Sequence, residues 1–91
     1  MTRDSRPTPL AEVIVQRAGD AQVLLHTGTG QYYTLDDVGG RIWALCDGQR
    51  TVADIVSRLC DEYDAPREQI EADALELLTD LEGERLLAAR S

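Results

Sequence analysis

Residues 31–48 read QYYTLDDVGGRIWALCDG, and the spacing of the apolar side chains changes within this stretch. The first five residues are uncharged and rich in aromatic and β-branched side chains, which is typical of a strand. From Asp36 onward, Val38, Ile42 and Leu45 recur at the spacing of a helix, and an Asp-Gly pair ends the pattern. The stretch therefore predicts a strand that leads directly into a helix.

Two more strand-like runs precede this stretch, at residues 12–17 and 22–26. Branched aliphatic residues dominate both runs, and short turns that contain glycine join them to each other and to residues 31–35. Connections this short allow only antiparallel neighbours. The first third of the chain is therefore predicted to be a three-stranded antiparallel meander in chain order.

Two more helices are predicted toward the C-terminus, over residues 51–63 and 66–82. Thr51 has the position of an N-cap, and Asp54 three residues later completes an acidic form of the capping box. Pro66 is a favoured first residue for the next helix. Three strands followed by three helices predict an α+β fold.

The two edge strands of this sheet differ in how they are protected. The first carries Glu12 and Arg17 and follows an arm with two prolines, and such features protect an edge from pairing with foreign strands. The last strand, Gln31 to Leu35, contains neither a charge nor a proline. Its outer backbone groups are therefore predicted to stay open to another strand.

The third helix carries an apolar arc that is wider than one sheet face requires. The arc comprises Ile70, Ala74, Leu77, Leu78 and Leu81, with Leu75 at its border. If this helix lies beside the last strand, part of the arc lines a groove in which an extended peptide adds as a fourth strand. Alternatively, Leu75 and Leu78 pack on the first helix or on a second copy of the chain.

Length and charge exclude several classes of function. The 91 residues include nine arginines, no lysine and seventeen carboxylates, for a formal charge of −8. A chain this short forms one domain, without room for a core and a deep catalytic cleft, so we expect no enzyme activity. Its negative charge repels phosphates and anionic lipids, so neither a nucleic acid nor a membrane is expected as partner.

No catalytic or metal-binding constellation is expected either. His26 is the single histidine and is predicted to be a solvated strand end. The Gly-containing turn at residues 27–30 leads into a strand rather than a helix, which favours a hairpin over a phosphate-binding loop. Cys46 and Cys60 lack the spacing of a metal or redox site and are predicted to be core residues. We expect no metal and no cofactor.

The N-terminal segment does not have the pattern of a secretory signal. Residues 1–10 are polar and contain two prolines, which predicts a flexible N-terminal arm before a domain at residues 11–88. The arm lacks the apolar segment of a secretory signal, and no apolar run approaches the length of a membrane span. The cytoplasm is therefore the expected compartment.

The stretch at residues 30–48, together with residues 51–55 and the leucine pattern of the third helix, resembles the PqqD family of peptide-recognition domains. The similarity covers residues 11–88 and looks closest to the stand-alone members of lasso-peptide pathways. It implies a winged helix-turn-helix-like fold that binds the leader segment of a ribosomally made precursor peptide. The leader adds as an antiparallel strand to the third strand, beside the third helix.

The resemblance further implies which residues bind the peptide and where it is delivered. Carried over by position, the binding residues are Gln31, Tyr32, Tyr33, Thr34, Leu35, Asp73, Ala74, Leu77 and Leu78. The receiving strand is the one that the edge argument selected independently. A non-catalytic peptide chaperone of this kind delivers its peptide to a modifying enzyme, such as the leader peptidase of a lasso-peptide pathway.

Two alternative functions follow from the same residues. One is the PqqD-type component of pyrroloquinoline quinone biosynthesis, which works with a radical-SAM enzyme. The other is a winged-helix DNA-binding regulator. Charge argues against the second, because the helix at residues 51–63 carries one arginine and three carboxylates, and that at residues 66–82 carries one arginine and six.

Overall fold

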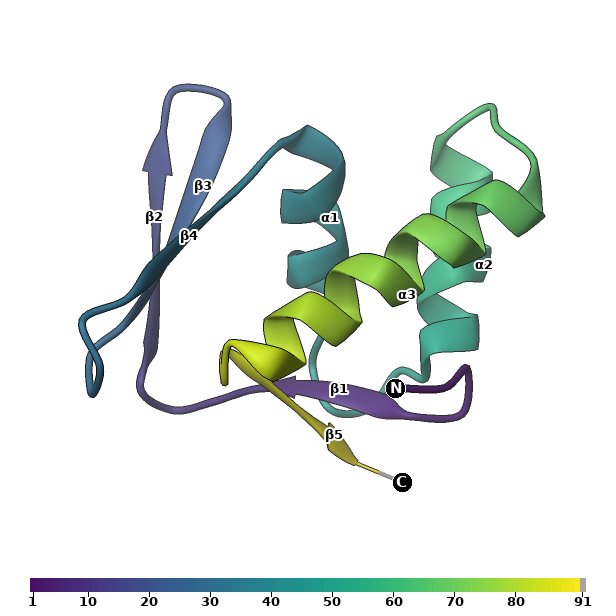
Figure 1. Cartoon of the computed structure of the whole chain (residues 1–91). Coiled ribbons are helices and arrows are strands. Elements are labelled where there is room, and N and C mark those ends of the chain that lie inside the picture. The colour runs from purple at the N-terminus through teal and green to yellow at the C-terminus, as the bar shows by residue number, and fades with distance from the viewer. Residues whose placement is uncertain (91) are drawn as a thin grey trace.

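The computed structural model describes residues 1–90, which form two small antiparallel sheets and three helices (Figure 1). In chain order the elements are β1 (Arg6–Pro9), β2 (Val13–Ala18), β3 (Ala21–His26), β4 (Tyr32–Leu35), α1 (Asp37–Leu45), α2 (Val52–Glu62), α3 (Arg67–Gly83) and β5 (Leu87–Arg90). The α+β class and the three helices predicted from sequence are confirmed.

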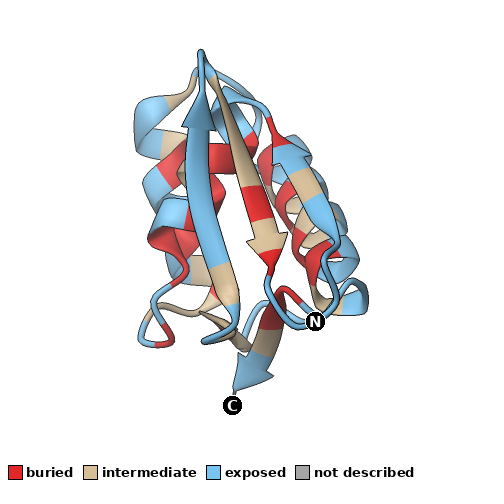
Figure 2. Ribbon diagram, turned by 90° about the vertical axis from the view of Figure 1, so that its left-hand side faces the viewer, coloured by how far each residue is buried: buried red, intermediate tan, exposed pale blue. Residues whose placement is uncertain are grey.

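The larger sheet has the strand order β2-β3-β4, which confirms the predicted antiparallel meander. Leu24 of β3 is completely buried and stands opposite Val15 of β2 and Tyr33 of β4. The helices cover the face of the sheet that carries Leu24, mainly over β3 and β4. Figure 2 shows β2 exposed along nearly its whole length beside the partly buried β3.

The start of α1 fixes the position of β4 against the helices. Asp36 caps α1, and its Oδ1 accepts a hydrogen bond from the Gly39 backbone N–H at 2.7 Å. A Cβ atom at Gly40 would lie 2.9 Å from the side chain of Gln22 on β3. The helix therefore packs closely on the sheet immediately after the strand ends.

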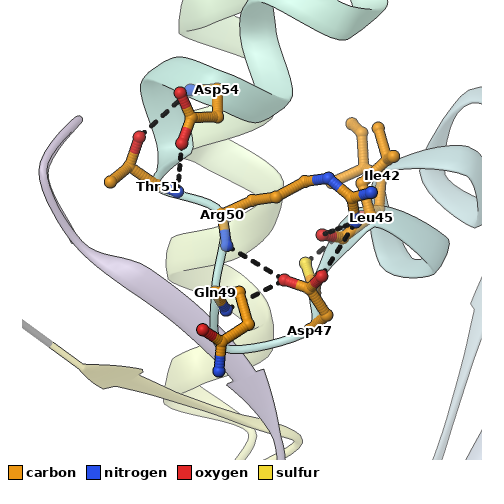
Figure 3. A network of polar contacts seen from close by, with 8 residues as sticks. Ile42, Leu45, Asp47, Gln49, Arg50, Thr51 and Asp54 are labelled. Atoms are coloured by element: carbon orange, nitrogen blue, oxygen red, sulfur yellow. Dashed lines mark hydrogen bonds and ion pairs between the residues drawn. The ribbon is translucent and has the colours of Figure 1, made fainter.

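The connection between α1 and α2 is held by local hydrogen bonds (Figure 3). Asp47 Oδ1 accepts from the backbone N–H groups of Arg50 and Gln49, both at 2.9 Å, and these bonds hold the pKa of the Asp47 carboxyl below its usual value. Thr51 and Asp54 form the predicted capping box of α2. A bidentate ion pair between Arg41 and Glu62, with both distances 2.8 Å, joins α1 to α2.

One continuous core lies between the larger sheet and the three helices. Its buried members are almost all aliphatic, as the composition predicts, and Trp43 is the only aromatic residue in the described part of it. Cys46 is buried there as predicted, and burial raises the pKa of its thiol to about 12. Cys60 is only half-buried.

The prediction of a flexible arm over residues 1–10 is wrong for Arg6–Pro9, because β1 pairs antiparallel with β5. Pro7 is buried in this small sheet. The segment before β1 also binds α2, since the backbone N–H of Val52 donates to Ser5 O at 2.9 Å and that of Ala53 to Arg3 O at 3.0 Å. The first backbone N–H groups of a helix have no acceptor within the helix, and here carbonyl groups of this segment accept their hydrogen bonds.

His26 is also placed differently from the sequence prediction, because its side chain is only 9% exposed. Its Nδ1 accepts hydrogen bonds from the backbone N–H groups of Gly28 at 3.1 Å and Thr29 at 3.2 Å. The imidazole therefore stabilises the turn between β3 and β4 through these two hydrogen bonds. None of the helices within residues 1–90 combines the length and the hydropathy that crossing a bilayer requires.

Candidate functional site

The free edge of β4 is defined by the turn that precedes it. Gly30 has a φ of +77°, and its N–H donates to His26 O at 2.8 Å while the His26 N–H donates to Gln31 O at 2.8 Å. This is a β-bulge with glycine in the left-handed conformation, which side chains other than glycine rarely adopt. Gly30 therefore sets the hydrogen-bonding phase of the whole strand.

The phase decides which backbone groups of β4 are free. Beyond the His26–Gln31 pair, hydrogen-bonded pairs recur every second residue, at Leu24–Tyr33 and at Gln22–Leu35. The backbone N–H and C=O groups of Tyr32 and Thr34 consequently point away from β3. These four groups are available to an added strand.

The side chains of β4 alternate between the two faces of the sheet. Tyr33 is half-buried and Leu35 is buried, and both lie on the face that the helices cover. Tyr32, which is 73% exposed, and Thr34 lie on the opposite face. A strand paired to this edge places alternate side chains on the same two faces.

A groove of about 660 Å³ runs beside β4, between this strand, the first turns of α1 and the middle of α3. Its lining is mainly apolar and includes Tyr33, Leu35, Val38, Ile42, Asp73 and Leu77. Figure 1 shows how these elements converge, with β4 rising to α1 and α3 crossing below it. The groove therefore accompanies the same edge that presents the free backbone groups.

The groove continues past the end of β4 into a second pocket of about 170 Å³. Val38, Ile42 and Asp73 line both spaces, and Tyr63 and Ala65 of the α2–α3 connection close the far side. The size resembles that of a cavity of roughly 150 Å³ that holds one benzene molecule. One aromatic or branched aliphatic side chain fits there.

Carboxylates mark the end of the groove near Leu35. Asp36 and Asp73 line the main groove, and Asp20 and Asp37 line a shallower space beside it. Glu71, in contrast, is engaged by Arg3 at 2.6 Å across the surface of α3. The field in this part of the groove therefore favours basic groups.

The residues predicted as a binding site divide into two groups. Tyr33, Thr34, Leu35, Asp73 and Leu77 line the groove, and Tyr32 lies on the exposed face of the same strand. Gln31 precedes β4 and lines a separate space near the end of α3.

Ala74 and Leu78 do not line the groove, and placing them in its wall was wrong. Both are completely buried in the core. The reason is helix geometry, because each follows a groove residue, Asp73 or Leu77, and is turned by about 100° from it. The two neighbouring stripes of α3 therefore face different spaces.

The sequence prediction of the site missed Val38 and Ile42 of α1, which form part of the groove wall. Their spacing predicted a helix, and no groove-lining role was assigned to either residue. Ile42 is buried, but Val38 is 42% exposed and lies one turn before it. An apolar residue in the first turn directly after an open strand was the available signal.

Comparison with known proteins gives consistent matches. Residues 21–87 match the family described as Coenzyme PQQ synthesis protein D (PqqD). The chain is 43% identical over 89 residues to a PqqA binding protein of Xanthomonas axonopodis pv. citri (strain 306), with 96% of this chain and 95% of that protein covered. A PqqA binding protein of Xanthomonas euvesicatoria pv. vesicatoria (strain 85-10) is 40% identical over the same coverage.

Two solved structures are similar over nearly the whole chain. TbiB1 in complex with the TbiA(beta) leader peptide has a TM-score of 0.82 and 34% identity, covering 92% of this chain and 98% of that one. Lasso peptide synthetase B1 complexed with the leader peptide has a TM-score of 0.78 and 27% identity, covering 94% and 99%. Both similar structures are therefore described as complexes with a peptide.

Proposed function

This chain belongs to the PqqD family, and we propose on that premise that it binds the leader segment of a ribosomally made precursor peptide without catalysing a reaction itself. The observation that carries the proposal is the open edge of β4 with an apolar groove beside it. Relatives named for binding PqqA and similar structures that contain leader peptides support the same function.

In this proposal the leader adds to β4 as an antiparallel strand. The peptide backbone forms hydrogen bonds with the free N–H and C=O groups of Tyr32 and Thr34. These bonds orient the peptide and do not depend on its side chains. Because β4 runs from Tyr32 to Leu35, an antiparallel peptide enters beside Leu35 and leaves beside Tyr32. This direction fixes which flank of the peptide meets which end of the groove.

Specificity comes from the side chains that the added strand turns toward the helices. They contact the apolar wall formed by Val38 and Leu77, and a residue before the strand reaches the pocket near Tyr63. Asp73 lies where the two spaces meet and favours a basic peptide residue. Ala74 and Leu78 support this wall from within the core.

We further propose that the bound leader is delivered to a modifying enzyme, a leader peptidase in a lasso-peptide pathway. The similarity to two lasso-pathway structures favours this partner. The second candidate is the PqqD-type role in pyrroloquinoline quinone biosynthesis with a radical-SAM enzyme, which the relatives named PqqA binding protein favour. In both cases the peptide-binding edge is the same.

The architecture is proposed to be of the winged helix-turn-helix type, since α2 and α3 follow each other through a short turn and the β2–β3 hairpin lies at the side of the helices. The recognition domain, predicted at residues 11–88, is proposed to extend to Arg6 because β1 pairs with β5. A cytoplasmic location, expected from the sequence, stays a prediction.

The proposal is tested by titrating fluorescein-labelled PqqA and TbiA(beta) leader peptides with the protein and recording fluorescence anisotropy. We expect saturable binding of at least one peptide. Leu77→Asp should weaken it about tenfold or more, because it places a charge in the apolar groove wall. Ala72→Asp, which adds the same charge at an exposed position of α3 away from the groove, is the matched control.

Absence of binding by both peptides contradicts the proposal. Equal losses from Leu77→Asp and Ala72→Asp contradict the assignment of the groove. Circular dichroism of both variants ensures that a lost signal does not reflect unfolding.

A further inference from the structure

Arg85 is an unusual residue for the backbone conformation that it adopts. Its φ is +62°, and it is the one residue other than glycine with a positive φ among residues 1–90. The Arg85 N–H donates to Glu82 O at 3.0 Å and the Leu86 N–H to Leu81 O at 2.9 Å. These two bonds define a helix ending in which glycine is the usual residue at the position of Arg85.

No ion pair or side-chain hydrogen bond of the described residues involves the Arg85 side chain. The residue is exposed. Gly83, which has the conformational freedom for this position, lies two residues earlier inside α3. A strained residue without a structural partner points to a role outside the fold.

The position of Arg85 indicates what that role is. Arg85 lines a polar groove of about 350 Å³ together with Gln31, the residue just before β4, and Thr29 of the preceding turn. This groove therefore lies where a peptide paired to β4 leaves the strand at Tyr32. The opposite end of the edge has Asp36 and Asp73, so the two ends differ in charge.

We propose that Arg85 binds a carboxylate of the peptide, on the flank that leaves β4 at Tyr32. The inference rests on the proposed function and adds a substrate class, a leader with an acidic residue just C-terminal to its strand-forming segment. Glu84 lines the same groove, so selection depends on contact with the guanidinium rather than on net charge. A guanidinium forms paired hydrogen bonds with a carboxylate, which gives such contact its specificity.

The separation between Asp73 and Arg85 sets the length of peptide that the test requires. Asp73 and Arg85 are twelve positions apart along helix and turn, which corresponds to about 18 Å, and about five or six extended residues span this length. A library of random twelve-residue peptides displayed on phage therefore covers the whole edge with both flanks.

The test selects this library separately on the wild-type protein and on Arg85→Asn, Arg85→Lys and Arg90→Asn. Asparagine tolerates the left-handed conformation, so Arg85→Asn removes the charge without adding strain. Arg90→Asn removes the same charge from an exposed position on β5 outside the grooves. We expect wild type and Arg90→Asn to enrich peptides with Asp or Glu after the strand-forming segment. Arg85→Lys, which keeps the charge but not the guanidinium, should enrich them less. Arg85→Asn should lose the acidic preference and still enrich strand-forming peptides.

The dissociation constant of a synthetic peptide from the wild-type selection then gives the size of the effect. Arg85→Gly should weaken its binding about three- to tenfold and raise the thermal midpoint of the protein, because glycine removes the strain together with the contact. Opposite changes in affinity and stability are not expected of a residue that only ends a helix.

The outcomes separate this inference from the function on which it rests. Peptides enriched without an acidic preference, an acidic preference that survives Arg85→Asn, or unchanged affinity in Arg85→Gly each overturn the role of Arg85 and leave peptide binding intact. Failure of the wild-type protein to enrich any peptide overturns the proposed function, and the inference with it.

Discussion

β2 and β4 are the two edge strands of one sheet, and both have an open backbone edge. They differ in the surroundings of their side chains. β2 carries Ile14 and Val15 with 47% and 41% exposure, one on each face, and no residue of β2 lines any of the grooves described above. β4 has its inner side chains turned into a groove whose other wall is α3. Figure 2 shows the difference as an exposed β2 and a β4 that ends in a buried residue.

This comparison teaches that an open edge alone does not make a recognition site. Both strands present outward backbone groups, at Val15 and Arg17 on β2 and at Tyr32 and Thr34 on β4. Only β4 adds a place for the side chains of the incoming strand. Backbone pairing supplies orientation, and the adjacent groove supplies selectivity.

The largest expected effect comes from blocking one edge and not the other. Thr34→Pro removes an outward N–H from β4 without losing a bond to β3, and Val15→Pro does the same on β2. We expect Thr34→Pro to weaken leader binding about 30- to 100-fold, since the lost bond and the clash of the ring cost about 2–3 kcal/mol. Val15→Pro should leave the dissociation constant within about twofold. Anisotropy titration measures both, and equal losses break the comparison.

A smaller effect is expected from the turns that precede β3 and β4. Gly19 and Gly30 have φ values of +64° and +77°, and neither has an atom within 4 Å of an added Cβ. Gly19→Ala and Gly30→Ala should therefore each lower the free energy of unfolding by about 1 kcal/mol, through backbone strain alone. Only Gly30→Ala should weaken leader binding, about five- to tenfold, because it disturbs the bulge that sets the phase of β4. Urea denaturation and anisotropy titration separate the two quantities, and identical binding by both variants contradicts the role of the bulge.

The smallest expected effect is electrostatic. Asp73→Asn should weaken binding of a leader with a basic residue before its strand about two- to fivefold in low salt and reduce the salt dependence of the dissociation constant. Asp61→Asn, a change of the same charge at an exposed position of α2 outside the grooves, serves as the control. If the dissociation constants of both variants depend equally on salt, Asp73 has no electrostatic role in binding.

Sequence reasoning located the central feature because the feature is local. The meander follows from short turns between β-branched runs, and the edge at β4 follows from the absence of charge and proline in five consecutive residues. The capping box of α2 is likewise a local pattern, between Thr51 and Asp54. Each of these depends on residues close in the chain.

The errors share a different cause, since they concern contacts between distant segments. β1 and β5 lie at opposite ends of the chain, and their four-residue runs carry no strand pattern of their own. Ala74 and Leu78 belong to the same apolar arc as Leu77, and only the position of α1 and β4 decides which stripe faces the groove. His26 and Arg85 acquire their roles from the turn and the helix end that surround them.

The most direct test of the central claim is amide hydrogen exchange of the protein with and without saturating leader peptide, followed residue by residue by NMR. The account predicts that the peptide slows exchange of the Tyr32 and Thr34 amides at least about tenfold, because they become donors to the added strand. The outward amides of Val15 and Arg17 on β2 should exchange at unchanged rates. Protection on β2, or binding without protection at Tyr32 and Thr34, contradicts the account.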